Sequence, residues 1–153
     1  MILGGSKKEV IKNIKEAADT GRFNDKVETG DPELSTAQRK RLLGKYVKQR
    51  NELPYHYRNG MARRIVDIVT FGVNIRTKVV GAEKIKNIKT GAIITSNHFN
   101  PVDTTIVRYG IKKVRKYRMF IICHDTNFAM KGLVGFLMRY ADEIPISKDK
   151  EYM

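Results

Sequence analysis

The second half of the chain alternates between two sequence patterns, and this alternation restricts the fold more than any other feature. Short apolar runs that read as strands lie at 76–80, 92–96, 118–122 and 143–147. Segments with apolar residues at helical spacing lie at 102–109 and 127–140. Strands that alternate with helices predict an α/β fold with parallel strand pairing. We therefore expect a partial sheet with flanking helices, preceded by an N-terminal helical segment.

The first 60 residues predict helices. Residues 6–18 carry apolar residues at helical spacing, and Ser6 with Glu9 forms a capping-box pattern. A second helix should begin at Asp31 and Pro32, since proline is favoured at the first helical position. The following stretch, NELPYHYRNG, should end it.

These patterns predict two regions: a basic helical N-terminal segment, 1–60, and an α/β domain, 61–153. Residues 61–75 are apolar with interspersed arginines, and two readings stay open for them. They form either a core helix or a helix in a membrane interface, with arginines at headgroup depth. No run approaches the roughly 18 apolar residues that a membrane-spanning helix needs.

The chain is strongly basic, with 30 Lys and Arg against 16 Asp and Glu and a net charge of +14. Nucleic acid, anionic lipid headgroups and phosphorylated substrates all fit this charge. The run KKVRKYR, 112–118, could grip such a partner or lie in a solvated loop. Few aromatic residues accompany it, which argues against a nucleic-acid-binding module. Cys123 is the only cysteine, so no internal disulfide can form, and burial is its simplest role.

A histidine and an aspartate follow the apolar run at 92–96, in the stretch IITSNHFNPVD. In one continuous helix, His98 and Asp103 would point to different faces. Pro101 changes this, because the residue before proline avoids helical dihedral angles. Asn100 then becomes the N-cap and Pro101 the first helical residue. His98 is predicted on the loop that leaves the strand, and Asp103 in the first helical turn.

This arrangement predicts either a catalytic pair or a simple helix start. If the loop folds back, Asp103 can fix the tautomer of His98, which can then take a proton from an alcohol. The site would lie at the carboxyl end of a strand, where open α/β sheets bind ligands. In the alternative, Asp103 only favours the helix dipole and His98 is a surface residue. His124 and Asp125 are adjacent, so we expect their side chains to diverge at a strand end.

The longer context resembles the glycerolipid acyltransferases, specifically the 1-acyl-glycerol-3-phosphate acyltransferases. Their hallmark is N-H-x-x-x-x-D directly after a short apolar strand, as in GAIITSNHFNPVD. An upstream G-x-E-x-I segment matches GAEKI at 81–85, and MKGLVGFLMRYADEIPISK resembles the family's second block. The resemblance covers roughly residues 61–150.

The resemblance implies transfer of a fatty acyl group from acyl-CoA or acyl carrier protein to a glycerophosphate hydroxyl, in phospholipid biosynthesis. His98 would be the general base and Asp103 its partner, with Asn97 among the substrate-binding residues. Lys148 stands where the family has an arginine for the acceptor phosphate, and it lacks the bidentate fork of arginine. Arg139 is a second candidate, for which an exposed helix arginine is the favoured interpretation.

Neither a metal nor a cofactor is expected, because acyl-CoA or acyl carrier protein serves as a co-substrate. The expected partner surface is a membrane with anionic lipids, and the expected location is peripheral, on its cytoplasmic face. The family also carries a downstream glutamate-glycine-threonine-arginine signature, and the sequence ends at Met153 before any such segment. We therefore expect a truncated member. A non-catalytic remnant that binds membrane or partner is the alternative.

Overall fold

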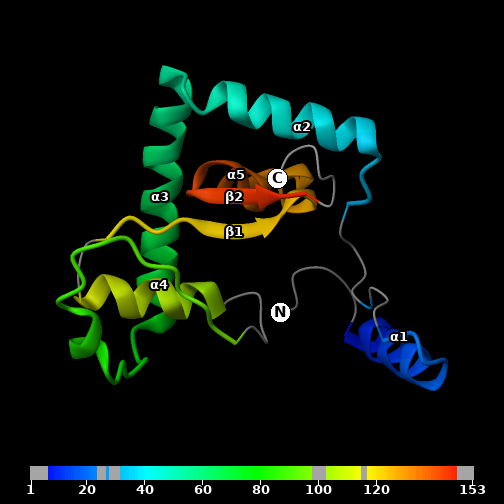
Figure 1. The fold of residues 1–153 in the computed structure, drawn as a ribbon, viewed down its shortest axis with the longest axis horizontal. Helices are drawn as coiled ribbons and strands as arrows, with labels where there is room; N and C mark the ends of the chain where they lie inside the picture. Colours follow the sequence, from blue (N-terminus) through cyan, green and yellow to red (C-terminus); the bar gives the residue numbers. More distant parts are fainter. Residues whose placement is uncertain (1–6, 24–26, 28–31, 98–102, 115–116, 148–153) are drawn as a thin grey trace.

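The protein has a helix-rich, mixed α/β fold around a small parallel sheet (Figure 1). The computed structural model describes residues 7–23, 27, 32–97, 103–114 and 117–147. The elements are α1 (Lys7–Asp19), α2 (Thr36–Gln49), α3 (Leu53–Asn74), the 3₁₀ helix η1 (Ala82–Ile85), α4 (Asp103–Val114), β1 (Ile121–His124), the 3₁₀ helix η2 (Asp125–Ala129), α5 (Gly132–Tyr140) and β2 (Glu143–Ile146). The mixed α/β class is as the sequence predicted.

The sheet pairs β1 with β2 in parallel, through a connection formed by η2 and α5. The register places Ile121 opposite Glu143 and His124 opposite Ile146. The two strands therefore end at the same edge of the sheet. Side chains at and just after His124 and Ile146 meet at this carboxyl edge, which is where parallel sheets present ligand sites.

Helices α2, α3 and α4 surround the sheet (Figure 1). Helix α3 contacts both α4 and α5. In Figure 1, α3 runs across the starts of both strands, while α2 and α4 lie on opposite sides of the sheet. The buried core joins Tyr55 and Ala62 of α3 to Tyr140 and Ala141 at the end of α5. Helix α1 stands apart from this body in the same view.

Two of the four predicted strands are absent from the described residues. Residues 77–80 and 91–97 adopt no regular structure, and the Ile93 side chain is 94% exposed. The predictions for 118–122 and 143–147 correspond to β1 and β2, with β1 beginning three residues late. An apolar run shows only that a segment can be buried. It does not supply the neighbouring strand that would bury it.

The helix predictions succeeded in type and failed at some boundaries. The 6–18 prediction is confirmed by α1, although Ser6 lies outside the described residues. Helix α2 begins later than Pro32 indicated, and Asp31 is outside the described residues. Ser35 is the N-cap instead, because Ser35 N donates to Gln38 Oε1 at 2.8 Å and Gln38 N donates to Ser35 Oγ at 3.3 Å. A reciprocal capping box satisfies two backbone N–H groups that would otherwise lack partners at the helix start.

The stretch 51–60 ends the second helix as predicted, since α2 stops at Gln49, but most of this stretch belongs to the next helix. Helix α3 begins at Leu53 and continues to Asn74, with Pro54 in its first turn. Proline is tolerated there because the first turn has no hydrogen-bond partner for the missing N–H. The proposed boundary after residue 60 thus falls inside a continuous helix. Within the described residues, no helix is both long enough and apolar enough to cross a bilayer.

Candidate functional site at the carboxyl edge of the sheet

Asp103, one of the two predicted catalytic residues, lies on helix α4. Asp103 is half-buried in the first turn of α4, as the sequence predicted. His98, Asn100, Pro101 and Lys148 lie outside the described residues, so the predicted His98–Asp103 contact stays a prediction. Asn97 is exposed at the end of the irregular segment 91–97.

The start of α4 is fastened to the end of α3 by buried polar groups. The Asn74 side-chain amide donates to Thr70 O at 2.9 Å and to Thr105 Oγ1 at 3.0 Å. Asn74 and Thr70 are both buried. Since Thr105 lies two residues after Asp103, these bonds fix the position of Asp103 relative to α3.

A second histidine and a second aspartate meet at the carboxyl edge, contrary to the expectation that their side chains diverge. The Nδ1 atom of His124 lies 3.3 Å from Asp125 Oδ1 and 2.8 Å from Thr126 Oγ1. The same Nδ1 accepts the Thr126 N–H at 3.4 Å and so caps η2. His124 therefore acts as a helix cap in this geometry.

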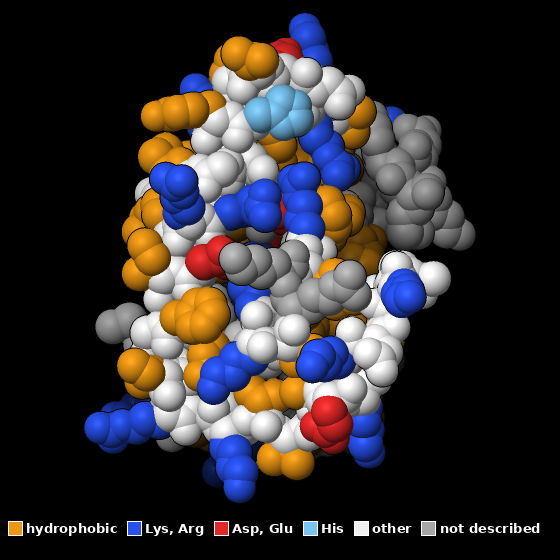
Figure 2. All heavy atoms as spheres, turned by 90° about the vertical axis from the view of Figure 1, so that its left-hand side faces the viewer, with side chains coloured by type: hydrophobic (Ala, Val, Ile, Leu, Met, Phe, Trp, Pro, Cys, Tyr) orange, Lys and Arg blue, Asp and Glu red, His pale blue; other side chains and the backbone are white. Residues whose placement is uncertain are grey.

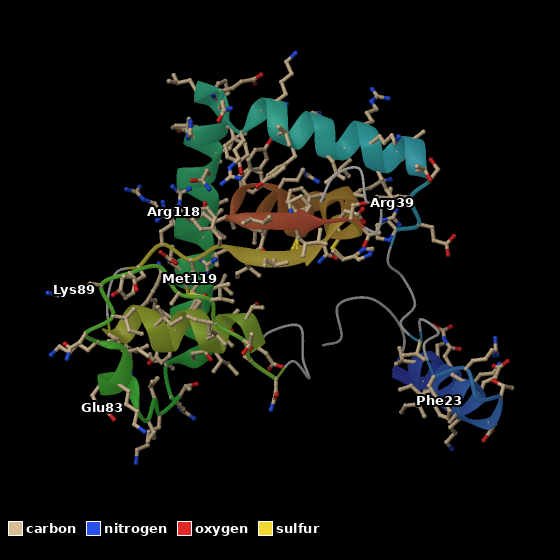
Figure 3. The ribbon with its side chains drawn as sticks, viewed as in Figure 1. Phe23, Arg39, Glu83, Lys89, Arg118 and Met119 are labelled. Atoms are coloured by element: carbon tan, nitrogen blue, oxygen red, sulfur yellow. The ribbon has the colours of Figure 1, made fainter. Side chains whose placement is uncertain are left out.

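Asp125 is the buried charge at this edge, and its side chain is fully enclosed. Arg39 of α2, which Figure 3 labels, forms an ion pair with Asp125. Burial raises the pKa of the Asp125 carboxyl, but hydrogen bonds from Ser147 and Arg39 and the positive charge of Arg39 outweigh burial. The pKa therefore lies below its ordinary value. Sequence reasoning missed this ion pair because its partners lie 86 positions apart.

A cavity of about 310 Å³ opens beside these residues, between the ends of the two strands. Ile122, Cys123 and His124 of β1 line it, together with Ile146 and Ser147. Burial raises the pKa of the Cys123 thiol to about 12, so the thiol is protonated at neutral pH. Cys123 is thus a half-buried, inert wall residue, close to the role that its sequence context predicted. Among the described residues, no cluster of three or more His, Cys, Asp or Glu side chains is placed to hold a metal ion.

Arg139, the predicted second phosphate contact, is half-buried and bonded to the backbone. Its Nη1 atom donates to Phe128 O and to Met130 O, both at 2.9 Å. It closes the junction between η2 and α5 and is not the exposed helix arginine that the sequence favoured. Gly135 permits this closure, because a Cβ atom at that position would overlap the Met130 carbonyl.

The opposite end of the strands holds a second buried carboxylate, Asp142. Arg118 donates to it twice, at 2.7 Å and 3.1 Å, Asn59 donates at 2.8 Å, and Arg63 lies at 3.2 Å. Burial raises the pKa of the Asp142 carboxyl, but the hydrogen bonds and positive charges of these partners hold it below its ordinary value. Asp142 has a φ of 67°, a conformation that non-glycine residues adopt at a cost.

The three described cations of the basic run 112–118 make contacts within the protein, while Arg115 and Lys116 lie outside the described residues. Lys112 pairs with Asp67, Lys113 lies 4.7 Å from the centre of the Tyr109 ring, and Arg118 binds Asp142. Figure 3 shows Arg118 at the opposite end of the strands from Arg39. These three cations therefore stabilise the fold. The sequence had left two other roles open for the run, which were binding of an anionic partner and a solvated loop.

Comparison with protein families matches residues 76–153 to the family described as Acyltransferase. The match covers 78 of the 153 residues and includes η1, α4, both strands and the N-H-x-x-x-x-D motif. No curated protein and no solved structure matches the chain significantly.

Proposed function

Because the chain belongs to the acyltransferase family, that of the glycerolipid acyltransferases, we propose that it moves a fatty acyl group from acyl-CoA or acyl carrier protein to the hydroxyl of a glycerophosphate. One observation carries the proposal: within the matched residues, Asp103 lies in the first turn of α4, five positions after His98. A carboxylate at that place can hold an imidazole on the preceding loop.

In the proposed mechanism, His98 takes the proton of the acceptor hydroxyl while its oxygen attacks the thioester carbonyl carbon. The tetrahedral intermediate collapses, the carbon–sulfur bond breaks, and the imidazolium returns its proton to the leaving thiolate. An ester and a free thiol result. Asp103 stabilises the imidazolium, and the proposal uses no covalent acyl–enzyme. Asn97 and Lys148 are the proposed contacts to the acceptor, Lys148 as a point charge for its phosphate.

Acyl transfer can be tested by following thiol release from oleoyl-CoA with and without lysophosphatidate. We expect release that depends on the acceptor, together with formation of phosphatidate. Glycerol in place of lysophosphatidate is the matched control, because it offers hydroxyls without phosphate or acyl chain. Equal release with and without acceptor would indicate thioester hydrolysis and count against the proposed transfer.

We also propose that the exposed face of α3 docks on anionic membrane surfaces, where the acceptor lipid resides. Tyr57, Met61 and Ile68 lie on one face of α3 at helical spacing, and all are exposed. Arg64 is exposed on the same face. Figure 2 shows the side of the molecule where α3 lies, with hydrophobic side chains among Lys and Arg. Such a face, in a chain of net charge +14, suits an anionic interface.

Vesicle sedimentation tests this surface. Ile68→Asp should weaken binding to phosphatidylglycerol-containing vesicles about tenfold, because it removes roughly 1.5 kcal/mol or more of apolar burial and adds repulsion. Val47→Asp on α2 is the matched control, since Val47 is also exposed but lies on another helix. Equal losses in the two variants would assign binding to net charge alone and remove the α3 face from the proposal.

A further inference from the structure

A cavity lies between α2 and the α5 side of the sheet, and the site above does not use it. Its volume is about 530 Å³, within the range of roughly 300–1,000 Å³ that is typical of small-molecule sites. Helix α2 forms one wall through Leu42 and its neighbours, and Phe128 with Tyr140 contributes to the other. We call this cavity the α2 groove.

Four aromatic rings form the floor of the α2 groove. Tyr46 meets Phe128 at a centroid distance of 5.2 Å and Tyr55 at 6.5 Å, and Tyr55 meets Tyr140 at 5.3 Å. Phe128, Tyr55 and Tyr140 are buried. The floor is therefore continuous and fixed by ring-to-ring packing.

The tyrosine hydroxyls of this floor form hydrogen bonds with other groups of the protein. The floor therefore presents ring surfaces to the groove. Tyr46 Oη donates to Glu143 O at 3.1 Å, and Tyr55 Oη donates to Arg139 O at 3.4 Å. Tyr140 Oη accepts from Arg58 at 3.1 Å. Burial raises the pKa of Tyr55 to about 12, so its phenol is neutral at physiological pH. A neutral aromatic floor with satisfied hydroxyls favours an apolar occupant.

The rim of the α2 groove is cationic. Arg41 and Lys45 are exposed one turn apart on α2, and the described lining residues contain no Asp or Glu. A cationic rim above an apolar floor suits a molecule with a long apolar body and an anionic head. Leu34 and Gln38 of the lining flank Arg39, whose partner Asp125 lies at the carboxyl edge of the sheet. Asp125 and the lining residue Phe128 both belong to η2, so this part of the groove lies near that edge.

We infer that the α2 groove binds the long acyl chain of an anionic acyl donor, an inference that rests on the proposed acyl-transfer function. The chain lies along the rings of Tyr46 and Phe128, and the anionic head faces Arg41 and Lys45. Helix α2 precedes the residues that match the family, and this inference gives it a role in substrate binding.

The test measures equilibrium binding of oleoyl-CoA, oleate and free CoA to the full chain and to paired variants. Leu42→Trp fills the groove, while Val47→Trp places the same ring on the same helix at a position that is 63% exposed and outside the groove. We expect Leu42→Trp to weaken oleoyl-CoA binding at least tenfold and Val47→Trp to change it less than twofold. The chain has no tryptophan, so the new ring also reports occupancy by fluorescence.

A second pair isolates the rim and does not depend on tolerance of a large side chain. Lys45→Glu reverses a charge on the groove, and Lys48→Glu reverses one on α2 outside it. Lys45→Glu should weaken oleoyl-CoA binding about threefold or more. Lys48→Glu should bind oleoyl-CoA about as tightly as the unmodified chain does. Thermal unfolding checks that all variants fold.

Equal binding within either pair, or free CoA binding as tightly as oleoyl-CoA, would overturn the inference. Groove-dependent binding of oleate as well as oleoyl-CoA would support it and show that a carboxylate suffices as the head. Groove-dependent binding without acyl transfer would count against the proposed function alone. Acyl transfer with unchanged binding and KM in the groove variants would count against the groove alone.

Discussion

His98→Ala should lower the rate of acyl transfer by about 10²–10⁴-fold, the range that a positioned general base contributes. The loss should appear in kcat, because the imidazole acts on the proton that moves during attack and adds little to ground-state binding. Asp103→Asn should also lower kcat, since an amide cannot stabilise the imidazolium. The initial rate of thiol release at saturating oleoyl-CoA and lysophosphatidate measures both effects.

His56→Ala is the matched control for the base, because His56 is exposed on α3. It should leave kcat unchanged, and both histidine variants should unfold at the same temperature as the unmodified chain. Undiminished turnover in His98→Ala would remove the proposed base. An effect of His98→Ala confined to KM would instead assign the imidazole to substrate binding.

Asp142→Ala should reduce the free energy of unfolding by about 2–3 kcal/mol. Removing one partner from a buried charge network costs roughly 3–5 kcal/mol, and the half-exposed Arg118 and Arg63 can regain water, which reduces the loss. Urea unfolding at neutral pH measures the change. Asp19→Ala on α1 is the control, because Asp19 is exposed. The free energy of unfolding of this variant should lie within about 0.5 kcal/mol of that of the unmodified chain.

Two further conditions separate charge from backbone strain at Asp142. Asp142→Gly relieves the left-handed backbone conformation but still loses every partner, so it should be less destabilising than Asp142→Ala. The folded pKa of Asp142 lies below its ordinary value of 3.8. Its stabilisation is therefore complete above that value and is lost as the pH falls through the lower folded pKa. The difference between Asp142→Ala and the unmodified chain should shrink below pH 3.8 and persist at pH 7.

Sequence reasoning succeeded where the signal was local. The helical spacing of 6–18 and the position of Asp103 in a first turn depend on neighbours within a few residues, and α1 and α4 confirm both. The capping box at Ser35 and Gln38 was an equally local signal, and proline at position 32 was wrongly preferred to it. The stretch 51–60 was correctly predicted to end the second helix, but the start of a new helix at Leu53 was not foreseen.

Sequence reasoning failed where a feature depends on distant partners. The apolar run at 92–96 looks like a buried strand, but burial needs a neighbouring strand, which the pattern does not specify. The ion pair of Arg39 with Asp125 and the binding of Arg118 by Asp142 join elements that only the fold brings together. The net charge includes these arginines as positive charge that a partner could bind. In the structure, each of them is paired with a buried carboxylate.

The continuity of α3 has a mechanical consequence. Its 22 residues form a rod about 33 Å long. Near its start, Asn59 binds the backbone of Tyr140 and the side chain of Asp142, and at its end Asn74 grips Thr105. The rod therefore ties together the residues just before β2 and the first turn of α4, which carries Asp103, and its length sets the separation between them.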